Sequence, residues 1–356
     1  MNGKEIYNEA YCAACYFRTV AEYPKRKCLI QLTEKCNLHC EHCFVSAQNI
    51  GQEMDIQKIR NIIVPQLQKN NIVKVTLTGG EPFVYPHLLE VVELLLEKNI
   101  AVGICTNATL ITEAFLEHFE KCENLHFNVS LDGFSPSSYG RFRGNQNIEL
   151  YNKIINNIKL LGKKGLLNGI LVTPNTYSSV QEYVKICEFA KSCHAKYVLM
   201  NPLSQFGRGE RTINLAFDNQ QMNELRKATK KFDDDDMEVV YIRFPNSEKK
   251  PLGECVAGKI MYIFTNGDIA FCPYMVFAAK DFGSVYNPKE FMLGNIFMED
   301  FDWKISLKNY KFPVNYNEVC QECDNHNCKK GCYAAKISQG RELIDADYEL
   351  CPLKKK

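Results

Sequence analysis

The run Cys36-Asn37-Leu38-His39-Cys40-Glu41-His42-Cys43 decides how this chain is interpreted. It comes just after an apolar segment, Cys28–Leu32, that has the composition of a β-strand. Three thiolates at C-x3-C-x2-C spacing on one short loop can bind three corners of a cubic iron–sulfur cluster and leave the fourth iron open. The alternative is a zinc site completed by His39 or His42, although zinc sites usually contain paired C-x2-C motifs.

The overall composition favours a large intracellular protein that binds metal. A formal net charge of +1 over 356 residues gives no electrostatic footprint for nucleic acid or for an anionic membrane. No apolar run is long enough for a transmembrane helix, and Met1–Glu5 lacks the basic and apolar regions of a signal peptide. Seventeen cysteines without a signal peptide indicate metal-bound thiolates in a reducing cytoplasm. We therefore expect a cytoplasmic protein with no nucleic-acid or membrane partner.

Strand-like and helix-like patterns alternate between residue 27 and about residue 245. The expected strands are Cys28–Leu32, Ile72–Thr78, Ala101–Cys105, Leu125–Leu131, Gly169–Thr173 and Lys196–Met200, with a further strand at Met237–Ile242. The expected helices are Asp55–Asn70, His87–Lys98, Ile111–Lys121, Ile148–Gly162, Ser178–Cys193 and Asn219–Lys231. Because strands separated by helices form right-handed parallel units, this order predicts an α/β fold with a partial (β/α)6 TIM-like barrel. The chemistry of such barrels lies at the C-terminal ends of the strands.

The second expected strand ends in Thr78-Gly79-Gly80-Glu81-Pro82. Glycines let a backbone approach a ligand closely, and the Glu81 carboxylate can pair with an ammonium group. Alone, this motif also fits an ordinary turn. Together with the three-cysteine run it resembles the radical S-adenosylmethionine (SAM) superfamily, in which a Gly-Gly-Glu motif at this place binds the methionyl amino group of SAM.

The resemblance implies a radical chemistry and its cofactors. Cys36, Cys40 and Cys43 would bind a [4Fe-4S] cluster, which a flavodoxin- or ferredoxin-type donor reduces. The reduced cluster would transfer one electron to SAM, whose cleavage gives methionine and a 5′-deoxyadenosyl radical. This radical would abstract hydrogen from an unactivated C–H bond of the substrate.

The resemblance also implies further contacts to SAM. Polar contacts are expected at the ends of the third and fourth strands, where we choose Asn107 and Ser130. An arginine could bind the SAM carboxylate through two hydrogen bonds, and we prefer Arg143 to Arg141, with solvation at the surface as the alternative. His42 occupies a position that usually carries an aromatic side chain near adenine.

A second cysteine pattern begins at residue 255. Its members are Cys255, Cys272, Cys320, Cys323, Cys328, Cys332 and Cys351. The pattern resembles the SPASM domain, which carries two auxiliary [4Fe-4S] clusters, in its Gly-x4-Cys step, its C-x2-C and its C-x3-C. The middle gap differs, with four residues where the family commonly has five. A zinc ribbon that uses Cys320, Cys323, Cys328 and Cys332 is the alternative.

The resemblance divides these cysteines between two clusters. The outer cluster would bind Cys320, Cys323, Cys328 and Cys351, and the inner cluster Cys255, Cys272 and Cys332. The interval Val256–Phe271 lacks the fourth cysteine that some relatives have, so we expect an open iron or a ligand from elsewhere. An open iron could bind a substrate thiolate. Cys12 and Cys15 are the outside candidates, although we interpret them as a disordered thiol pair.

These resemblances predict an N-terminal extension at 1–26, a radical SAM partial barrel at 27–245 and a SPASM domain at 246–356. SPASM proteins mostly modify peptides, so we expect a peptide substrate and an oxidative thioether or C–C cross-link. Cys272 is followed by Pro273-Tyr274 where sulfatase maturases have an acid, which argues against formylglycine formation. Because so few residues precede the first strand, we expect either a separate leader-binding protein or a substrate that is recognised without one.

Three alternatives to this function remain open. The chain could be a radical SAM dehydrogenase for a small molecule or for cofactor biosynthesis. It could be a peptide epimerase, for which Cys105 is a candidate hydrogen donor. It could also be a non-catalytic Fe–S carrier or a zinc-stabilised scaffold, a reading that the intact cysteine run and Gly79-Gly80-Glu81 disfavour.

Overall fold

The computed structural model describes the whole chain except residues 1–9, 17–20, 121, 282, 313–317 and 354–356. A ten-stranded sheet has the strand order β10-β9-β8-β1-β2-β3-β4-β5-β6-β7. Its strands are β1 Arg26–Thr33, β2 Ile72–Gly79, β3 Ala101–Thr106, β4 Leu125–Ser130, β5 Leu167–Val172, β6 Tyr197–Met200, β7 Glu238–Tyr241, β8 Ile260–Ile263, β9 Asp268–Ala270 and β10 Met292–Asn295.

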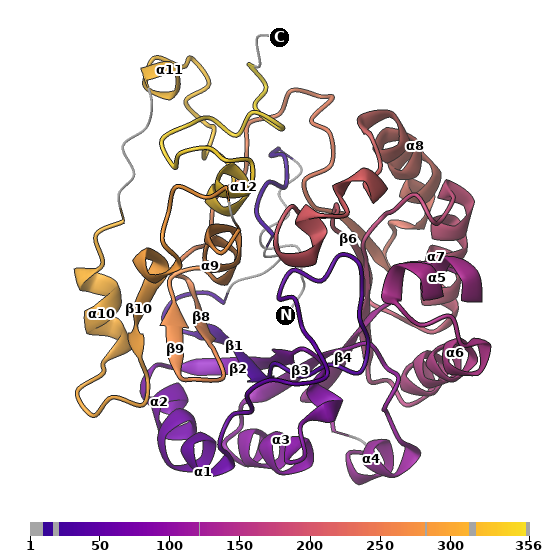
Figure 1. Ribbon diagram of the computed structural model, residues 1–356. Coiled ribbons are helices and arrows are strands. Elements are labelled where there is room, and N and C mark those ends of the chain that lie inside the picture. Colours follow the sequence, from indigo (N-terminus) through magenta and orange to yellow (C-terminus); the bar gives the residue numbers. More distant parts are fainter. Residues whose placement is uncertain (1–9, 17–20, 121, 282, 313–317, 354–356) are drawn as a thin grey trace.

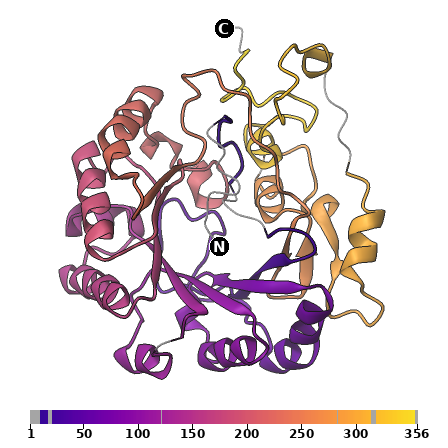
Figure 2. The same cartoon turned by 180° about the vertical axis from the view of Figure 1, so that it is seen from behind.

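The strands β1 to β7 are parallel and follow one another along the sheet. The helices are α1 Ile56–Lys58, α2 Val64–Lys69, α3 Leu88–Glu97, α4 Glu113–His118, α5 Pro136–Arg143, α6 Ile148–Lys163, α7 Val180–Ser192, α8 Asn219–Thr229, α9 Pro273–Ala279, α10 Trp303–Asn309, α11 Glu318–Gln321 and α12 Tyr333–Ser338. Figures 1 and 2 show the sheet curving around the middle of the molecule with α3, α4, α6 and α7 outside it. The predicted α/β fold with a parallel, incompletely closed barrel is therefore confirmed.

Several helices begin at polar residues that bind free backbone N–H groups. Asp55, at the start of the first expected helix, accepts a hydrogen bond from the backbone N–H of Gln57 at 2.8 Å. The helix expected over 55–70 is interrupted by a π-helical turn at Ile59–Ile63, directly before Pro65. Proline lacks the N–H that an uninterrupted α-helix would need there, which explains the irregular turn.

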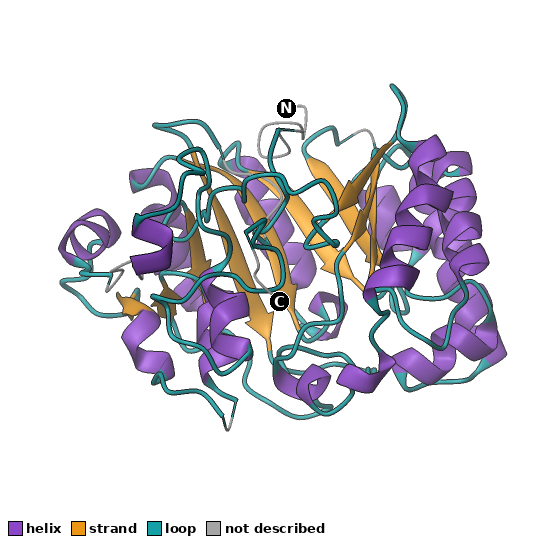
Figure 3. Ribbon diagram, turned by 90° about the horizontal axis from the view of Figure 1, so that it is seen from above, coloured by secondary structure: helices purple, strands orange, loops and turns teal. Residues whose placement is uncertain are grey.

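The C-terminal cysteine-rich part extends the barrel sheet. β8 pairs in parallel with β1, so that Lys27 lies opposite Ile260 and Ile30 opposite Ile263. β9 and β10 then add antiparallel strands. The helices α9 and α12 pack together at the open side of the barrel, as Figure 1 shows. Figure 3 shows from above that helices lie on both sides of the strands. The backbone hydrogen bonds between β1 and β8 therefore join the predicted barrel domain (27–245) to the predicted C-terminal domain (246–356). The division of the chain at residue 245 stays a prediction.

The structure contradicts the interpretation of Cys12 and Cys15 as a disordered thiol pair. Both side chains are buried, at 8% and 7% exposure. The backbone N–H of Cys12 donates to the carbonyl of Pro251 at 2.8 Å, and Gly253 donates to the carbonyl of Cys12 at 2.9 Å. Paired backbone groups hold this segment against the C-terminal part.

No helix among the described residues is long and apolar enough to cross a membrane.

Candidate active site

The three-cysteine loop follows β1 and turns its thiols toward a cavity inside the barrel. Cys36, Cys40 and Cys43 all line this cavity. The backbone N–H of Leu38 donates to the Cys36 sulfur, and that of Ala47 donates to the Cys43 sulfur, both at 3.4 Å. Hydrogen bonds to the sulfurs are among the features that tune iron–sulfur clusters, so this donor set fits a [4Fe-4S] cluster.

Arg208 fixes the backbone of the cysteine loop through hydrogen bonds to its carbonyl groups. Its Nε donates to the carbonyl of Cys40 at 2.8 Å, and its Nη1 donates to the carbonyl of Ala47 at 2.7 Å. The backbone N–H of Arg208 also donates to the carbonyl of Cys43 at 3.1 Å. Sequence reasoning missed this residue, because it lies in a short 3-10 turn, Gly207–Glu210, without a periodic pattern.

The two glycines after β2 approach the protein backbone closely. A Cβ on Gly79 would lie 2.4 Å from the carbonyl oxygen of Thr33, and one on Gly80 would lie 2.3 Å from that of Lys35. The N–H of Gly80 donates to the Thr33 carbonyl at 2.8 Å. Side chains at these positions would push β2 away from the start of the cysteine loop. Both glycines also line the cavity.

Glu81 is a buried carboxylate with a fixed orientation. Only 1% of the residue is exposed. One carboxylate oxygen accepts from the Thr106 hydroxyl at 2.6 Å and from the Phe83 N–H at 3.1 Å, and the other accepts from the Asn107 N–H at 2.7 Å. Burial raises the pKa of Glu81 to about 7, although these hydrogen bonds oppose the rise. A cationic ligand in the cavity would favour the ionised form.

The Asn107 side chain connects the end of β3 to the cysteine loop. Its Nδ2 donates to the Asn37 Oδ1 at 3.0 Å and lies 4.0 Å from the Cys36 sulfur. Its Oδ1 accepts from the Thr109 N–H at 2.9 Å. Asn107 therefore lines the cavity and its side chain orients the cysteine loop, while its contact with SAM stays a prediction.

Arg143 is buried and paired, contrary to the solvated alternative. Its Nη2 lies 2.5 Å from the Oδ2 of Asp132, and its Nη1 lies 3.7 Å from the Cys40 sulfur. Burial alone would lower the pKa of Arg143. The nearby Asp132 carboxylate has the opposite effect, and the net pKa is raised, so the guanidinium stays charged. Asp132 follows β4 and was not chosen from the sequence, although it stands two residues after Ser130. Arg141, in contrast, is exposed and stacks on Tyr177.

The His42 ring is positioned by stacking. It lies parallel to the Phe142 ring with centroids 4.2 Å apart. Its Nε2 lies 3.6 Å from Asp132 Oδ2, and its buried Nδ1 has no hydrogen-bond partner among the residues that the structure describes. Burial lowers the pKa of His42 to about 4, so the ring is neutral. A flat neutral ring on the cavity wall suits the expected contact with adenine.

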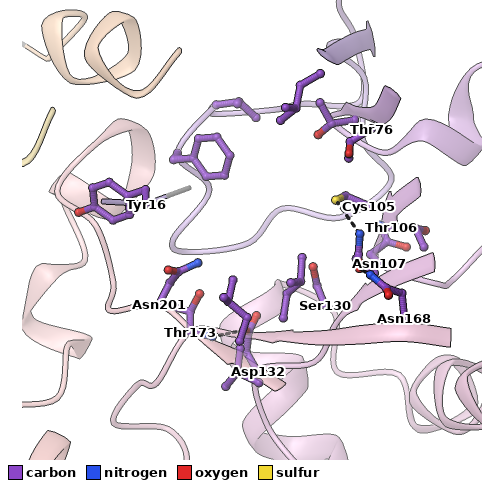
Figure 4. Close-up of a pocket in the computed structure, with 18 of the residues that line it drawn as sticks. Tyr16, Thr76, Cys105, Thr106, Asn107, Ser130, Asp132, Asn168, Thr173 and Asn201 are labelled. Carbon is purple, nitrogen blue, oxygen red and sulfur yellow. Dashed lines mark hydrogen bonds between the residues drawn. The ribbon is translucent and has the colours of Figure 1, made fainter. Parts of the chain in front are cut away.

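The cavity has a volume of about 940 Å³ and connects the two cysteine-rich parts. Figure 4 shows Ser130, Asp132, Thr173 and Asn201 along one side, and Tyr16 across the cavity from Cys105. The buried Oδ1 of Asn201 has no partner within the described residues, so a ligand can bind it. Pro273, Tyr274 and Phe277 of α9 form another wall.

Cys105 lines the same cavity. Its sulfur accepts a hydrogen bond from Asn128 Nδ2 at 3.8 Å, and Asn128 in turn accepts from the Tyr197 hydroxyl at 2.6 Å. Burial raises the pKa of the Cys105 thiol to about 11. The thiol therefore keeps its proton at neutral pH, as a hydrogen-atom donor must.

The division of the C-terminal cysteines between two clusters stays a prediction, although some of their thiols influence one another. Burial raises the pKa of Cys351, and the nearby thiols of Cys320, Cys328 and Cys323 raise it further. Cys272 precedes α9 and Cys332 precedes α12, two helices that pack together. Burial raises the pKa of the Cys272 thiol, and the Cys332 thiol raises it further. Cys255 lies beside them. Within the described residues, no group of three or more His, Cys, Asp or Glu side chains is arranged to hold a metal ion.

Comparison with known proteins identifies the family. Residues 30–187 match the model of the Radical SAM superfamily. The chain is therefore related to this superfamily through residues 30–187. Among curated radical SAM relatives, the antilisterial bacteriocin subtilosin biosynthesis protein AlbA of Bacillus subtilis is 26% identical over 323 residues, which cover 87% of this chain and 68% of AlbA. The mycofactocin maturase MftC of Mycobacterium tuberculosis is 24% identical over 333 residues, which cover 90% of this chain and 81% of MftC.

Solved structures confirm the radical SAM fold over nearly the whole chain. Streptococcus suis SuiB bound to the precursor peptide SuiA superposes with a TM-score of 0.70 at 19% identity, covering 94% of this chain and 77% of SuiB. The enzyme anSMEcpe with bound AdoMet superposes with a TM-score of 0.62 at 18% identity, covering 92% and 93%. The chain is thus a radical SAM enzyme related to peptide maturases, with a cysteine-rich C-terminal part of SPASM type. Its family implies SAM and one [4Fe-4S] cluster.

Proposed function

We propose that this radical SAM enzyme modifies a peptide oxidatively, forming a thioether or C–C cross-link, with two auxiliary [4Fe-4S] clusters. The observation that carries the proposal is the shared cavity. The thiols of Cys36, Cys40 and Cys43 lie on one wall, and Pro273-Tyr274, which directly follow Cys272, lie on another. A substrate between these walls would lie between the cysteines that would hold the first cluster and the residues that follow Cys272.

The residues that line the cavity would bind the first cluster and SAM. When bound, the first cluster and SAM together supply a 5′-deoxyadenosyl radical. Cys36, Cys40 and Cys43 would hold that cluster. Glu81 would bind the methionyl ammonium of SAM, because its carboxylate is already oriented by three hydrogen bonds. His42 would pack against adenine.

Other cavity residues would complete the SAM site. Asn107 and Ser130 would supply polar contacts, and Gly79 and Gly80 would let the backbone pass close by. Arg143 is already paired with Asp132, so it would approach the SAM carboxylate only with that pair intact. Fixed donors of this kind orient a ligand without reorganisation.

The size of the cavity and the names of its relatives support a peptide substrate. Pockets for drug-sized ligands have volumes of roughly 300–1,000 Å³, so a cavity of about 940 Å³ has room for SAM and part of a second molecule. AlbA takes part in bacteriocin biosynthesis, MftC is a maturase, and SuiB binds a precursor peptide. A leader-binding protein and a flavodoxin- or ferredoxin-type donor are the partners that we propose.

The auxiliary clusters would make the reaction a net oxidation. Forming a cross-link removes two hydrogen atoms from the peptide. One leaves as a hydrogen atom, and the other leaves as a proton while its electron passes to an auxiliary cluster. We assign Cys320, Cys323, Cys328 and Cys351 to the outer cluster and Cys255, Cys272 and Cys332 to the inner one.

Anaerobic co-expression tests the proposal. The enzyme is expressed with each short open reading frame that flanks its gene, and the peptides are analysed by mass spectrometry. We expect one peptide to lose the mass of two hydrogen atoms, with the new bond located by fragmentation. The matched control replaces Cys36, Cys40 and Cys43 with Ala and leaves every peptide unchanged. The proposal would be refuted if every peptide stayed unmodified and the same enzyme oxidised a small molecule instead.

Peptide epimerisation is a second candidate function, favoured by Cys105. Its protonated thiol faces the cavity, as an epimerase needs in order to return a hydrogen atom to the opposite face of a substrate carbon. An epimerase run in deuterated water incorporates deuterium without net mass loss from oxidation. The Cys105→Ala variant would then stop the incorporation while SAM cleavage continues. Loss of two hydrogen atoms with no deuterium incorporation rules this candidate out.

A further inference from the structure

The inner face of β2 carries polar side chains from one end of the strand to the other. Lys74, Thr76 and Thr78 alternate along β2, and all three line the cavity. The interior of a closed barrel is filled by bulky apolar side chains, a class to which these three residues do not belong. Both threonines are only partly buried, so the cavity continues along β2 away from Gly79. At about 3.3 Å per residue, Lys74 lies roughly 16 Å from Gly79 along the strand.

A glycine on the next strand leaves space beside these side chains. Gly103 of β3 lies opposite Thr76 in the register of the sheet. A Cβ at this glycine would lie 3.4 Å from Thr76 Oγ1, 3.7 Å from Lys74 Cε and 3.9 Å from Asn128 Nδ2. Its φ is not positive, so the backbone conformation does not require glycine. Three polar side chains therefore converge on a space that a side chain at Gly103 would fill.

Asn128 presents its amide nitrogen to this space in a fixed orientation. Its Oδ1 accepts hydrogen bonds from Asn168 Nδ2 at 2.9 Å and from the Tyr197 hydroxyl at 2.6 Å. Because two donors hold the oxygen, the Nδ2 faces the other way, toward Gly103 and the Cys105 sulfur at 3.8 Å. Figure 4 shows Cys105 and Asn168 at this wall of the cavity. The buried amide therefore offers N–H donors to a ligand.

Two lysines bring positive charge to the same part of the wall. Lys27 of β1 and Lys74 of β2 are register partners in parallel strands, and both line the cavity. Like charges at neighbouring positions repel each other, and an anion between them offsets that repulsion. The Lys74 charge also reaches β4, because it lowers the pKa of His126, after the larger effect of burial. The lysines thus supply the positive charge here, while the His126 ring is neutral at pH 7.

The acidic residues of the cavity lie at another part of the wall. Three aspartates at residues 234–236 and Glu238 line the cavity directly before or within β7. In the sheet, β3, β4, β5 and β6 separate β7 from β2. Lys196 is a cavity lysine on the acidic side, and its carbonyl accepts from the Glu238 N–H at 3.0 Å. The wall around Gly103 is therefore the part of the cavity that favours an anion.

We propose that the space beside Gly103 binds a carboxylate of the peptide substrate. Thr76 Oγ1 and Asn128 Nδ2 would donate hydrogen bonds to its oxygens, and Lys74 would supply the positive charge. Hydroxyl, amide and ammonium donors suit this ligand, because a carboxylate has about four lone-pair sites that only accept hydrogen bonds. This inference rests on the proposed function and adds a substrate class to it. The peptide would carry an acidic side chain, or its own C-terminal carboxylate, close to the residue that is modified.

Such a site would fix how deeply the substrate enters the barrel. Thr76 lies roughly 10 Å before Gly79 along β2, which is the length of about three residues of extended peptide. The modified residue would then lie within about three residues of the carboxylate. An amide in place of that carboxylate would leave the Lys74 charge without its anion, so the site would select against neutral peptides.

Calorimetric titration with small probes tests the site without the peptide. The reconstituted full-chain enzyme is saturated with SAM and kept without reductant, so that the probes cannot enter the SAM site. N-acetylglycine carries a terminal carboxylate, and the α-amide of N-acetylglutamic acid carries a side-chain carboxylate. N-acetylglycinamide is the neutral control. We expect at least one carboxylate probe to bind about tenfold more tightly than the neutral probe. The tighter of the two shows which carboxylate the site takes.

Three variants locate the binding. Lys74→Met should weaken the carboxylate probe about tenfold and leave N-acetylglycinamide unchanged. Gly103→Ala places a methyl group in the space at ordinary contact distances, so the protein should fold and also bind the probe about tenfold more weakly. Lys196→Met, the matched control on the acidic side, should change the affinity by less than about twofold. The SAM affinity of each variant, measured in the same way, shows that it is folded.

The assignment is overturned if the neutral probe binds as tightly as both carboxylates. It is also overturned if Lys196→Met weakens binding as much as Lys74→Met, because the general charge of the cavity would then be responsible. Failure of the proposed function gives a different result. In that case the probes bind beside Gly103 as expected, but co-expressed peptides stay unmodified in the mass spectra.

Discussion

The two cysteine-rich regions of this enzyme are built in different ways. The first draws Cys36, Cys40 and Cys43 from eight consecutive residues, and strand ends and Arg208 fix their loop. The second would gather its thiols from segments as far apart as Cys255 and Cys351. A local site needs correct backbone conformation over one loop, whereas the second site needs the whole tertiary structure. Substitutions should therefore separate the two regions by what they abolish.

The largest effect is expected for Cys36→Ala. Loss of one of three thiolates removes the cluster that reduces SAM, so 5′-deoxyadenosine formation should fall to the level of heat-inactivated enzyme. Chromatographic detection of 5′-deoxyadenosine under dithionite measures this. Cys193→Ala, a buried thiol at the end of α7, is the matched control and should retain activity. Equal activity in both variants would contradict the assigned site.

Cys332→Ala should separate SAM cleavage from product formation. The variant keeps the barrel loop intact, so we expect SAM cleavage within about threefold of wild type, a difference of less than 1 kcal/mol. Product should be absent, and the iron content should fall by about four. Iron analysis and mass spectrometry of the same sample provide both readouts. Normal product from this variant would show that the inner cluster is dispensable.

Arg208→Ala tests how the local region is held. It removes two charge-assisted hydrogen bonds to carbonyl groups, each worth about 1.5–3 kcal/mol at most when partly buried. We expect the free energy of unfolding of the cluster-free protein to fall by about 1–3 kcal/mol in urea titrations. Arg211→Ala, in the same loop but exposed, should change it by less than about 0.5 kcal/mol. Similar values for the two variants would mean that Arg208 does not fix the loop.

The smallest effect concerns pH. With a pKa raised to about 7, Glu81 is mostly protonated at pH 6 and mostly ionised at pH 8. Because only the carboxylate attracts an ammonium group, the affinity for SAM should rise about tenfold across this range. The free energy of unfolding should change in the opposite direction. It should fall as pH rises through 7, because ionising a buried carboxylate destabilises the native state.

Calorimetric titration of SAM at several pH values measures the binding effect. The Glu81→Gln variant should bind more weakly at pH 8 and lose the pH dependence. A wild-type affinity that stays constant between pH 6 and pH 8 would show that Glu81 does not bind the SAM ammonium.

Much of the barrel could be predicted from sequence because its signals are local. Alternating apolar patterns and caps such as Asp55 placed the parallel strands and most of the helices. The cysteine spacing and Gly79-Gly80-Glu81 located the cavity, since parallel strands end at the same edge. Pro65 was also visible, but its consequence, a π-helical turn, depends on how the neighbouring turns adjust.

The remaining features depend on contacts between distant segments. The short apolar run of β8, Ile260–Ile263, does not reveal that its partner is β1. Asp132 and Arg143 are separate in sequence, and only α5 brings them together. Cys15 showed no motif that distinguished it from Cys12. The two thiols are equally buried, and only their packing neighbours, which follow from tertiary structure, distinguish them.

The pairing of β8 with β1 has a consequence for synthesis of the chain. β1 ends at Thr33, but the strand that covers its edge ends at Ile263. A ribosome adding roughly 5–20 residues per second needs roughly 10 to 50 seconds to make the intervening chain. During that time the edge of β1 is open to pairing with other chains. Any chaperone or cluster-loading factor that acts on the nascent chain therefore binds a barrel whose β1 edge is still unpaired. Expression at a lower temperature with slower initiation should increase the yield of folded enzyme.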